Sequence, residues 1–125
     1  MAIKLKEVSR YILIGFYAFA GSYHFINPEF YFGLIPDYLS FPEFINYAAG
    51  IAEITLAVAI GFITSRPLAI KGLILMLLAF IPSHVYFIEI GACIEGSICV
   101  DPWVAWLRLL IVHPLLIFWA WKVKD

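Results

Sequence analysis

Four long runs of apolar residues dominate the chain, and shorter polar or turn-forming segments separate them. The runs cover residues 8–26, 44–63, 68–90 and 103–121. Each is close to the ~20 residues that a helix needs to cross the apolar part of a bilayer. The pattern therefore predicts an all-α fold, an integral membrane four-helix bundle in which each run is one membrane-spanning helix.

Turn and capping signals mark where three of these helices begin. The signals are a capping box at Ser40-Phe-Pro-Glu43, Ser65 ahead of Arg66-Pro67, and a first-turn proline in Asp101-Pro102. No repeat or linker divides the sequence, so we expect residues 1–125 to form a single transmembrane domain. An interfacial outer loop would cover residues 27–43, and a cysteine-containing outer loop would cover residues 91–102.

The composition supports a membrane location. Hydrophobic residues make up 64% of the 125 residues and charged residues 14%, against roughly 45–50% and 25% in soluble domains. A soluble domain of this size could not bury so much apolar surface, so the lipid bilayer is the expected partner. The net charge of −1, without a basic stripe, predicts no nucleic-acid partner.

Lysine and arginine indicate how the helices are oriented. Apart from Arg108, the basic residues lie near the start of the first run, around the second connection and at the C-terminus, and are Lys4, Lys6, Arg10, Arg66, Lys71, Lys122 and Lys124. The first and third connections contain none. The positive-inside rule then places both termini in the cytoplasm and those two connections outside the cytoplasmic (inner) membrane. Ala18-Phe-Ala20 resembles a signal-peptide cleavage site, but we expect no cleavage because the apolar run continues to residue 26.

Each outer loop carries its own signal. Residues 27–43 are rich in aromatic and aliphatic side chains, so we expect an interfacial anchor, with a lid folded over the bundle as the alternative. Cys93 and Cys99 lie on the predicted outer side, where disulfides persist. A disulfide closing so short a loop contributes roughly 2 kcal/mol. We expect this structural role because a catalytic dithiol is usually Cys-X-X-Cys.

Ionisable side chains inside the predicted spans are the candidate ligand-binding residues. They are His24, Glu53, His84, Arg108 and His113. Such groups are costly in hydrocarbon, so they face the bundle interior and find partners. Counted along the helices, all five lie in the outer half or near the midplane. We expect Glu53 to pair with Arg108, with His84 or His113 bridging below or beside them.

Two prolines next to these histidines refine the expectation. Pro82 and Pro114 kink their helices and free the carbonyls of Leu78 and Leu110. These kinks favour a polar pocket between the third and fourth spans. The alternative is that the polar groups only hold the bundle together through interhelical hydrogen bonds. No helix shows a His-X-X-X-His or Glu-X-X-His spacing, so no metal site is predicted.

Several segments resemble the DoxX-like family of membrane proteins. The segments are Ala20-Gly-Ser-Tyr-His24-Phe-Ile-Asn-Pro28-Glu-Phe-Tyr31, Ile35-Pro36, Gly50-Ile-Ala-Glu53, Arg66-Pro-Leu-Ala-Ile-Lys-Gly72 and Phe80-Ile-Pro-Ser-His84-Val-Tyr86. Relatives commonly carry Pro-Ala-Asn where this chain has Pro82, Ser83 and His84, and the resemblance stops near Tyr86. It implies a four-helix bundle with both ends cytoplasmic. Some DoxX-like proteins are subunits of a thiosulfate:quinone oxidoreductase, others associate with superoxide-detoxifying and sulfurtransferase partners, and a distant animal relative resembles a receptor-assembly chaperone.

Together these observations predict an accessory protein of membrane redox metabolism. It would bind a small amphipathic ligand, quinone-like or lipid-like, in the outer half of the membrane. The alternative is an assembly factor that binds another membrane protein, or further copies of itself, through its helix surface. No redox cofactor motif is visible and no catalytic residue stands out, so we do not expect an independent enzyme. If the protein has enzymatic activity, it would be a subunit of a quinone-linked oxidoreductase.

Overall fold

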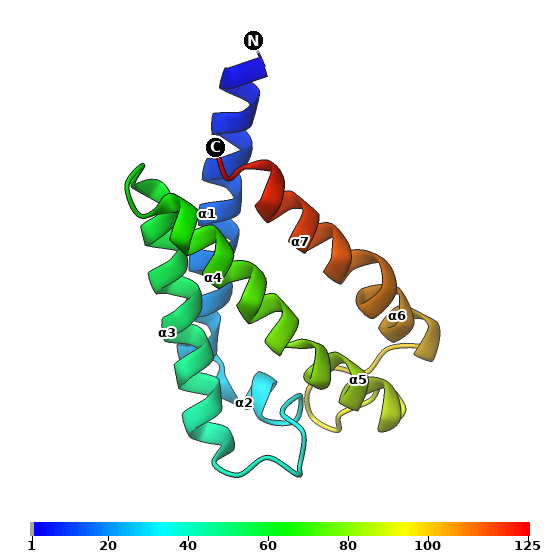
Figure 1. Ribbon diagram of the computed structural model, residues 1–125. Coiled ribbons are helices and arrows are strands. Elements are labelled where there is room, and N and C mark those ends of the chain that lie inside the picture. The colour runs from blue at the N-terminus through cyan, green and yellow to red at the C-terminus, as the bar shows by residue number, and fades with distance from the viewer. Residues whose placement is uncertain (1) are drawn as a thin grey trace.

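The computed structural model describes residues 2–125 and consists of helices joined by short connections (Figure 1). The elements are α1 (Ala2–Ile26), α2 (Pro28–Phe32), α3 (Pro42–Gly61), α4 (Arg66–Ala79), α5 (Ile81–Glu89), α6 (Pro102–Leu107), the π-helical turn η1 (Arg108–Val112) and α7 (His113–Lys122). Within this range the only β-type pairing is an isolated antiparallel bridge between Cys93 and Cys99. The all-α prediction is confirmed.

Three helical segments are long and apolar enough to cross a membrane. They are α3, the combined α4–α5 segment (Arg66–Glu89) and the combined α6–α7 segment (Pro102–Lys122). With 25 residues, α1 is the longest single helix, but its N-terminal part is more polar. The chain therefore has the character of a membrane protein, and α1 as a fourth span stays a prediction.

The two ends of the chain lie at the same end of the molecule, while α2 and the cysteine loop lie at the opposite end (Figure 1). α1 packs along α3, α3 packs against α4, and α4 packs against α7. Arg10 ties α1 to the C-terminal segment, because its Nε donates to the carbonyl of Val123 at 3.0 Å and its Nη2 donates to the carbonyl of Asp125. Trp119 Nε1 donates to Ser9 Oγ at 2.8 Å.

The closest helix contact is between α1 and α3, where two glycines face each other. A Cβ on Gly50 would lie 2.8 Å from the Cβ of His24 and 2.9 Å from the carbonyl oxygen of Gly21. Small residues allow such close approach of helices in membranes. The buried face of α3 is formed by residues three or four positions apart, namely Asn46, Gly50, Glu53, Ala57 and Ile60.

Breaks interrupt the third and fourth predicted spans beside their prolines. The predicted helix over residues 68–90 begins at Arg66 and is divided at Phe80 into α4 and α5, with Pro82 in the first turn of α5. In the last span, η1 precedes Pro114, and the backbone N–H of His113 bonds to the carbonyl of Arg108 five residues earlier. A wider π-turn accommodates the missing N–H of a proline.

One predicted helix cap is wrong, and a second is confirmed in position but makes no capping hydrogen bond. α3 begins at Pro42, and the preceding residue is Phe41 in a left-handed conformation with φ 60°, so Ser40 lies one residue too early to cap the helix. The residue before a proline avoids the helical region, which explains why the helix cannot start at Phe41. Ser65 precedes α4, but its hydroxyl donates to the carbonyl of Ala59 at 2.6 Å instead of capping α4.

The segment that joins α2 to α3 packs against α5. Leu34 is buried, and its carbonyl accepts a hydrogen bond from Ser83 Oγ at 2.5 Å. Tyr38 and Phe41 of the same segment are exposed. The two predicted roles of this segment, interfacial anchor and lid, stay predictions.

Candidate ligand-binding cavity

A cavity of about 450 Å³ lies between the helices and the segment that joins α2 to α3. All five predicted ligand-binding residues line it, namely His24, Glu53, His84, Arg108 and His113. They come from α1, α3, α5, η1 and α7, respectively. The structure therefore brings together residues up to 89 positions apart in the sequence, from His24 to His113. Most of the remaining lining is apolar or aromatic and includes Phe16, Leu77, Phe80 and Leu116.

His24 is held in place by an amide that sequence reasoning missed. Its Nδ1 lies 2.6 Å from Asn46 Oδ1, and Asn46 Nδ2 donates to the carbonyl of His24 at 3.0 Å. The side-chain amide of Asn46 donates through Nδ2, so its Oδ1 can only accept. The hydrogen in the contact between His24 and Asn46 Oδ1 is therefore on Nδ1 of His24. Asn46 is only 1% exposed. Its position four residues before Gly50, on the same face of α3, was the available sequence signal.

The other ring nitrogen of His24 contacts Glu53. Nε2 lies 3.1 Å from Glu53 Oε2, and both side chains are 7% exposed. This is an ion-pair distance, but the atoms are not aligned as a hydrogen bond, and Oε2 has no hydrogen-bond partner among residues 2–125. Glu53 is tolerated in an apolar helix because it faces the interior and has His24 beside it.

The predicted pairing of Glu53 with Arg108 is wrong. In the described part of the chain, the ion pairs are His24 with Glu53 and Lys6 with Asp125. The reason is the close contact of Gly21 with Gly50, which brings α1 against the face of α3 that carries Glu53.

Tyr31 covers the imidazole of His24. The two rings stack with centroids 3.6 Å apart and an interplanar angle of 13°. Burial, followed by the charge of Glu53 and the neighbouring Tyr23, raises the pKa of Tyr31 to about 12. The phenol is therefore neutral at physiological pH, and α2 places a flat, uncharged surface over the histidine.

The other two histidines, one on α5 and one on α7, lie close to each other. The ring centroids of His84 and His113 are 4.6 Å apart, at an interplanar angle of 62°. His113 Nε2 donates to the carbonyl of Leu77 at 2.5 Å, next to the break at Phe80. The carbonyl that was expected to need a partner is that of Leu78, whereas His113 bonds to Leu77, whose carbonyl also accepts from the N–H of Phe80 at 3.2 Å.

Three buried polar side-chain atoms in residues 2–125 have no hydrogen-bond partner. They are Tyr17 OH, Glu53 Oε2 and Arg108 Nη1, and all three residues line the cavity. Arg108 also lies over the ring of Phe87, with Cζ 5.2 Å from the centroid. Sequence reasoning missed Tyr17, because one tyrosine among many aromatic side chains gives no signal.

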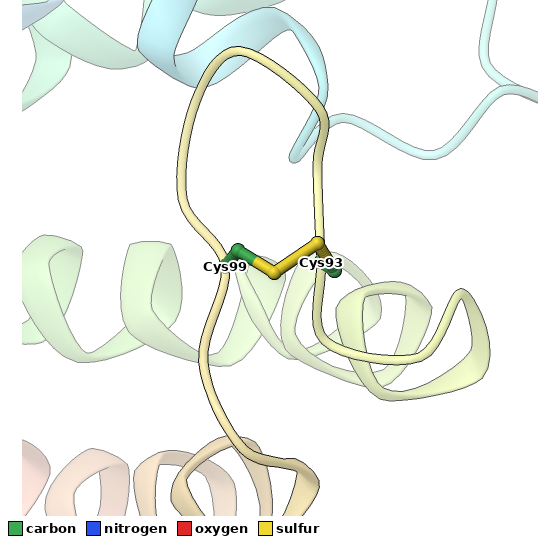
Figure 2. Close-up of a disulfide and its surroundings, with 2 residues drawn as sticks. All are labelled: Cys93 and Cys99. Carbon is green, nitrogen blue, oxygen red and sulfur yellow. A yellow bond between two sulfur atoms is a disulfide. The ribbon is translucent and has the colours of Figure 1, made fainter.

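The disulfide between Cys93 and Cys99 is formed, as predicted (Figure 2). The sulfurs are 2.10 Å apart and join the two sides of a loop whose tip contacts α2. Ser97 Oγ donates to the carbonyl of Phe30 at 3.2 Å, and Ile94 packs so closely on Gly33 that a Cβ there would lie 2.6 Å from its side chain. The loop thus supports the segment that lines the cavity.

No group of three or more His, Cys, Asp or Glu side chains within the described range could hold a metal ion. The model of a family described as a domain of unknown function, DUF8561, matches residues 13–124. No curated protein and no solved structure matches the chain.

Proposed function

The chain belongs to the DUF8561 family, and from the geometry of its cavity we propose that it binds one small amphipathic molecule, quinone-like or lipid-like, inside the membrane. In this proposal it acts as an accessory to membrane redox metabolism and not as an independent catalyst. The quinone alternative and the redox context rest on the resemblance to DoxX-like proteins, which stays a prediction.

One observation carries the proposal, namely that the buried side-chain polar atoms without a hydrogen-bond partner in residues 2–125 all belong to residues lining one cavity. A buried polar atom without a partner costs about 1–3 kcal/mol. Polar groups that only hold a bundle together would bond to one another across the helices. The hydroxyl of Tyr17 and Nη1 of Arg108 have no such bond within residues 2–125, so their hydrogen-bonding capacity is available to a ligand, while Glu53 Oε2 contacts His24 of α1.

The rest of the cavity fits the apolar part of such a ligand. Its volume of about 450 Å³ falls in the range of roughly 300–1,000 Å³ that small-molecule pockets occupy. Aliphatic and aromatic side chains make up most of the wall, and a few polar groups supply orientation. An amphipathic molecule dissolved in the bilayer matches both parts.

The membrane topology is part of the proposal. In this proposed topology α1 crosses the membrane in addition to the three other spanning segments. Both termini are cytoplasmic, and the cavity opens in the outer half of the membrane. An even number of crossings requires both termini on one side, and they lie at one end of the molecule (Figure 1). The disulfide is at the opposite end, which suits an oxidising compartment.

Extraction tests the proposal directly. The protein is purified in mild detergent, extracted with organic solvent, and the extract is analysed by mass spectrometry and visible spectroscopy. We expect a stoichiometric quinone or lipid that is enriched over its share in the membrane. A co-purifying membrane protein with no small molecule would favour the assembly-factor alternative instead.

Glu53→Gln provides the matched variant. It keeps the shape of the side chain but removes its charge next to His24, and we expect the recovered ligand to fall because the ion pair that holds His24 at the cavity wall is lost. Glu43→Gln removes an exposed carboxylate from the same helix and should leave recovery unchanged. Equal recovery in the two variants would assign Glu53 a purely structural role.

A further inference from the structure

We propose that the ligand in this cavity carries an anionic head group, and that Arg108 selects it. The ligand class is a monoanionic amphiphile such as a long-chain carboxylate. This inference rests on the proposed function and deepens it, because an amphipathic ligand could equally have a neutral or a cationic head.

The three arginines of the chain show what is unusual about Arg108. Arg10 donates to the carbonyls of Val123 and Asp125. Arg66 Nε donates to the carbonyl of Ile60 at 2.9 Å. Both guanidinium groups thus bond to the ends of other segments. Arg108 has no such acceptor within residues 2–125, and its Nη1 is buried without a partner.

Arg108 is also without an acidic partner in the described part of the chain. A guanidinium stays protonated in proteins, so its charge cannot be removed by losing a proton. The face of Phe87 gives partial compensation from 5.2 Å, but a cation–π contact is worth only about 0.5–2 kcal/mol. A positive charge at the wall of an apolar cavity therefore lacks its counter-charge.

Glu53 does not supply that counter-charge, because it is already paired with His24. Glu53 is thus matched by His24 at 3.1 Å and not by Arg108. Within residues 2–125, the guanidinium of Arg108 lines the cavity without an acidic partner.

A single anionic head group removes this imbalance. The planar fork of arginine matches a carboxylate with two parallel hydrogen bonds. Tyr17 OH, which lines the same cavity without a partner, is a further donor. The apolar lining then takes the chain of the ligand. A neutral head would leave the charge of Arg108 uncompensated, and a cationic head would add to it.

The test compares head groups on one chain. The protein in nanodiscs of neutral lipid is titrated with an alkanoate, an alkanol and an alkylammonium of equal chain length. Binding is followed by tryptophan fluorescence and corrected for partition into empty nanodiscs. We expect the alkanoate to bind about ten- to hundredfold more tightly than the alkanol, as for one charge-assisted contact, and the ammonium to bind most weakly.

Variants then assign the preference to its residue. Arg108→Gln should bind alkanoate and alkanol alike, and saturable binding of alkanol by this variant also reports that the cavity has folded. Arg108→Lys should keep part of the preference, and it serves as the test if the glutamine variant does not fold. Lys71→Gln removes an exposed cation on α4 that does not line the cavity and should change nothing.

The outcomes separate this inference from the proposed function. Equal affinity of the wild-type protein for alkanoate and alkanol overturns the anionic head and leaves an amphiphile-binding cavity. Tightest binding of the ammonium overturns it as well, and would mean that Glu53 sets the charge of the site. Absence of binding for all three ligands overturns both.

Discussion

The close contact of Gly21 with Gly50 is predicted to be the structural basis of the site, and Gly50→Ala tests it. The added Cβ would lie 2.8 Å from His24 Cβ, 2.9 Å from the carbonyl oxygen of Gly21 and 2.9 Å from Phe25 Cε2. Two of these neighbours are a backbone atom and an atom bonded directly to the backbone. Rotating a side chain cannot relieve them, so α1 and α3 must move apart.

The size of the effect follows from two opposing terms. Overpacking a well-packed contact costs about 1–3 kcal/mol, and the backbone involvement here puts the cost at the upper end. Alanine in place of glycine within a helix returns up to about 1 kcal/mol. The expected net loss is about 2 kcal/mol in the free energy of unfolding. Separation of the helices should also weaken the bonds of His24 to Asn46 and its contact with Glu53.

Reversible unfolding by SDS in mixed micelles, followed by tryptophan fluorescence, measures this loss. Gly15→Ala is the matched control, because Gly15 lies in α1 and a Cβ there meets nothing within 4 Å. It should leave the free energy of unfolding unchanged or raise it by up to about 1 kcal/mol. If Gly50→Ala were as stable as Gly15→Ala, the helices would not be in backbone contact and the derivation of the site would fail.

Two further perturbations probe the disulfide and the histidine pair. Replacing Cys93 and Cys99 together by serine should lower the free energy of unfolding by about 2 kcal/mol, and added reductant should then have no further effect; an undiminished response to reductant in this variant would contradict the assignment. His113→Phe removes one of two donors to the carbonyl of Leu77, which keeps the bond from the N–H of Phe80 at 3.2 Å, and should cost about 0.5–1.5 kcal/mol in the same assay. His84→Phe removes no hydrogen bond present in residues 2–125 and should cost clearly less, so equal losses would rule out the role of the Leu77 bond.

The apolar runs predicted the helices well because hydrophobic length depends on sequence alone. The disulfide could also be predicted from the sequence, because two cysteines that lie close together in one loop have few alternative partners. The helix start at Pro42 was missed for a local reason. Ser40 and Glu43 have capping-box spacing, but a proline between them prevents Phe41 from being helical.

Formal charge alone could not identify the side chain that pairs with Glu53. Arg108 was the obvious opposite charge, while His24 looks neutral in a sequence and lies on a different helix. Pairing depends on helix rotation, and rotation here is set by a glycine–glycine contact. The usable signal was the common face of α3 that carries Gly50 and Glu53, read together with Gly21, which lies three residues before His24.

Photolabelling tests most directly whether the cavity holds an amphiphile. A long-chain carboxylate with a photoreactive group in its chain is irradiated with the protein in nanodiscs, and labelled peptides are mapped by mass spectrometry. We predict adducts on cavity residues such as Phe16, Leu77 and Leu116, and their loss when unlabelled carboxylate is in excess. Adducts confined to exposed side chains away from the cavity, such as Ile12 and Leu75, and insensitive to competitor, would contradict the account.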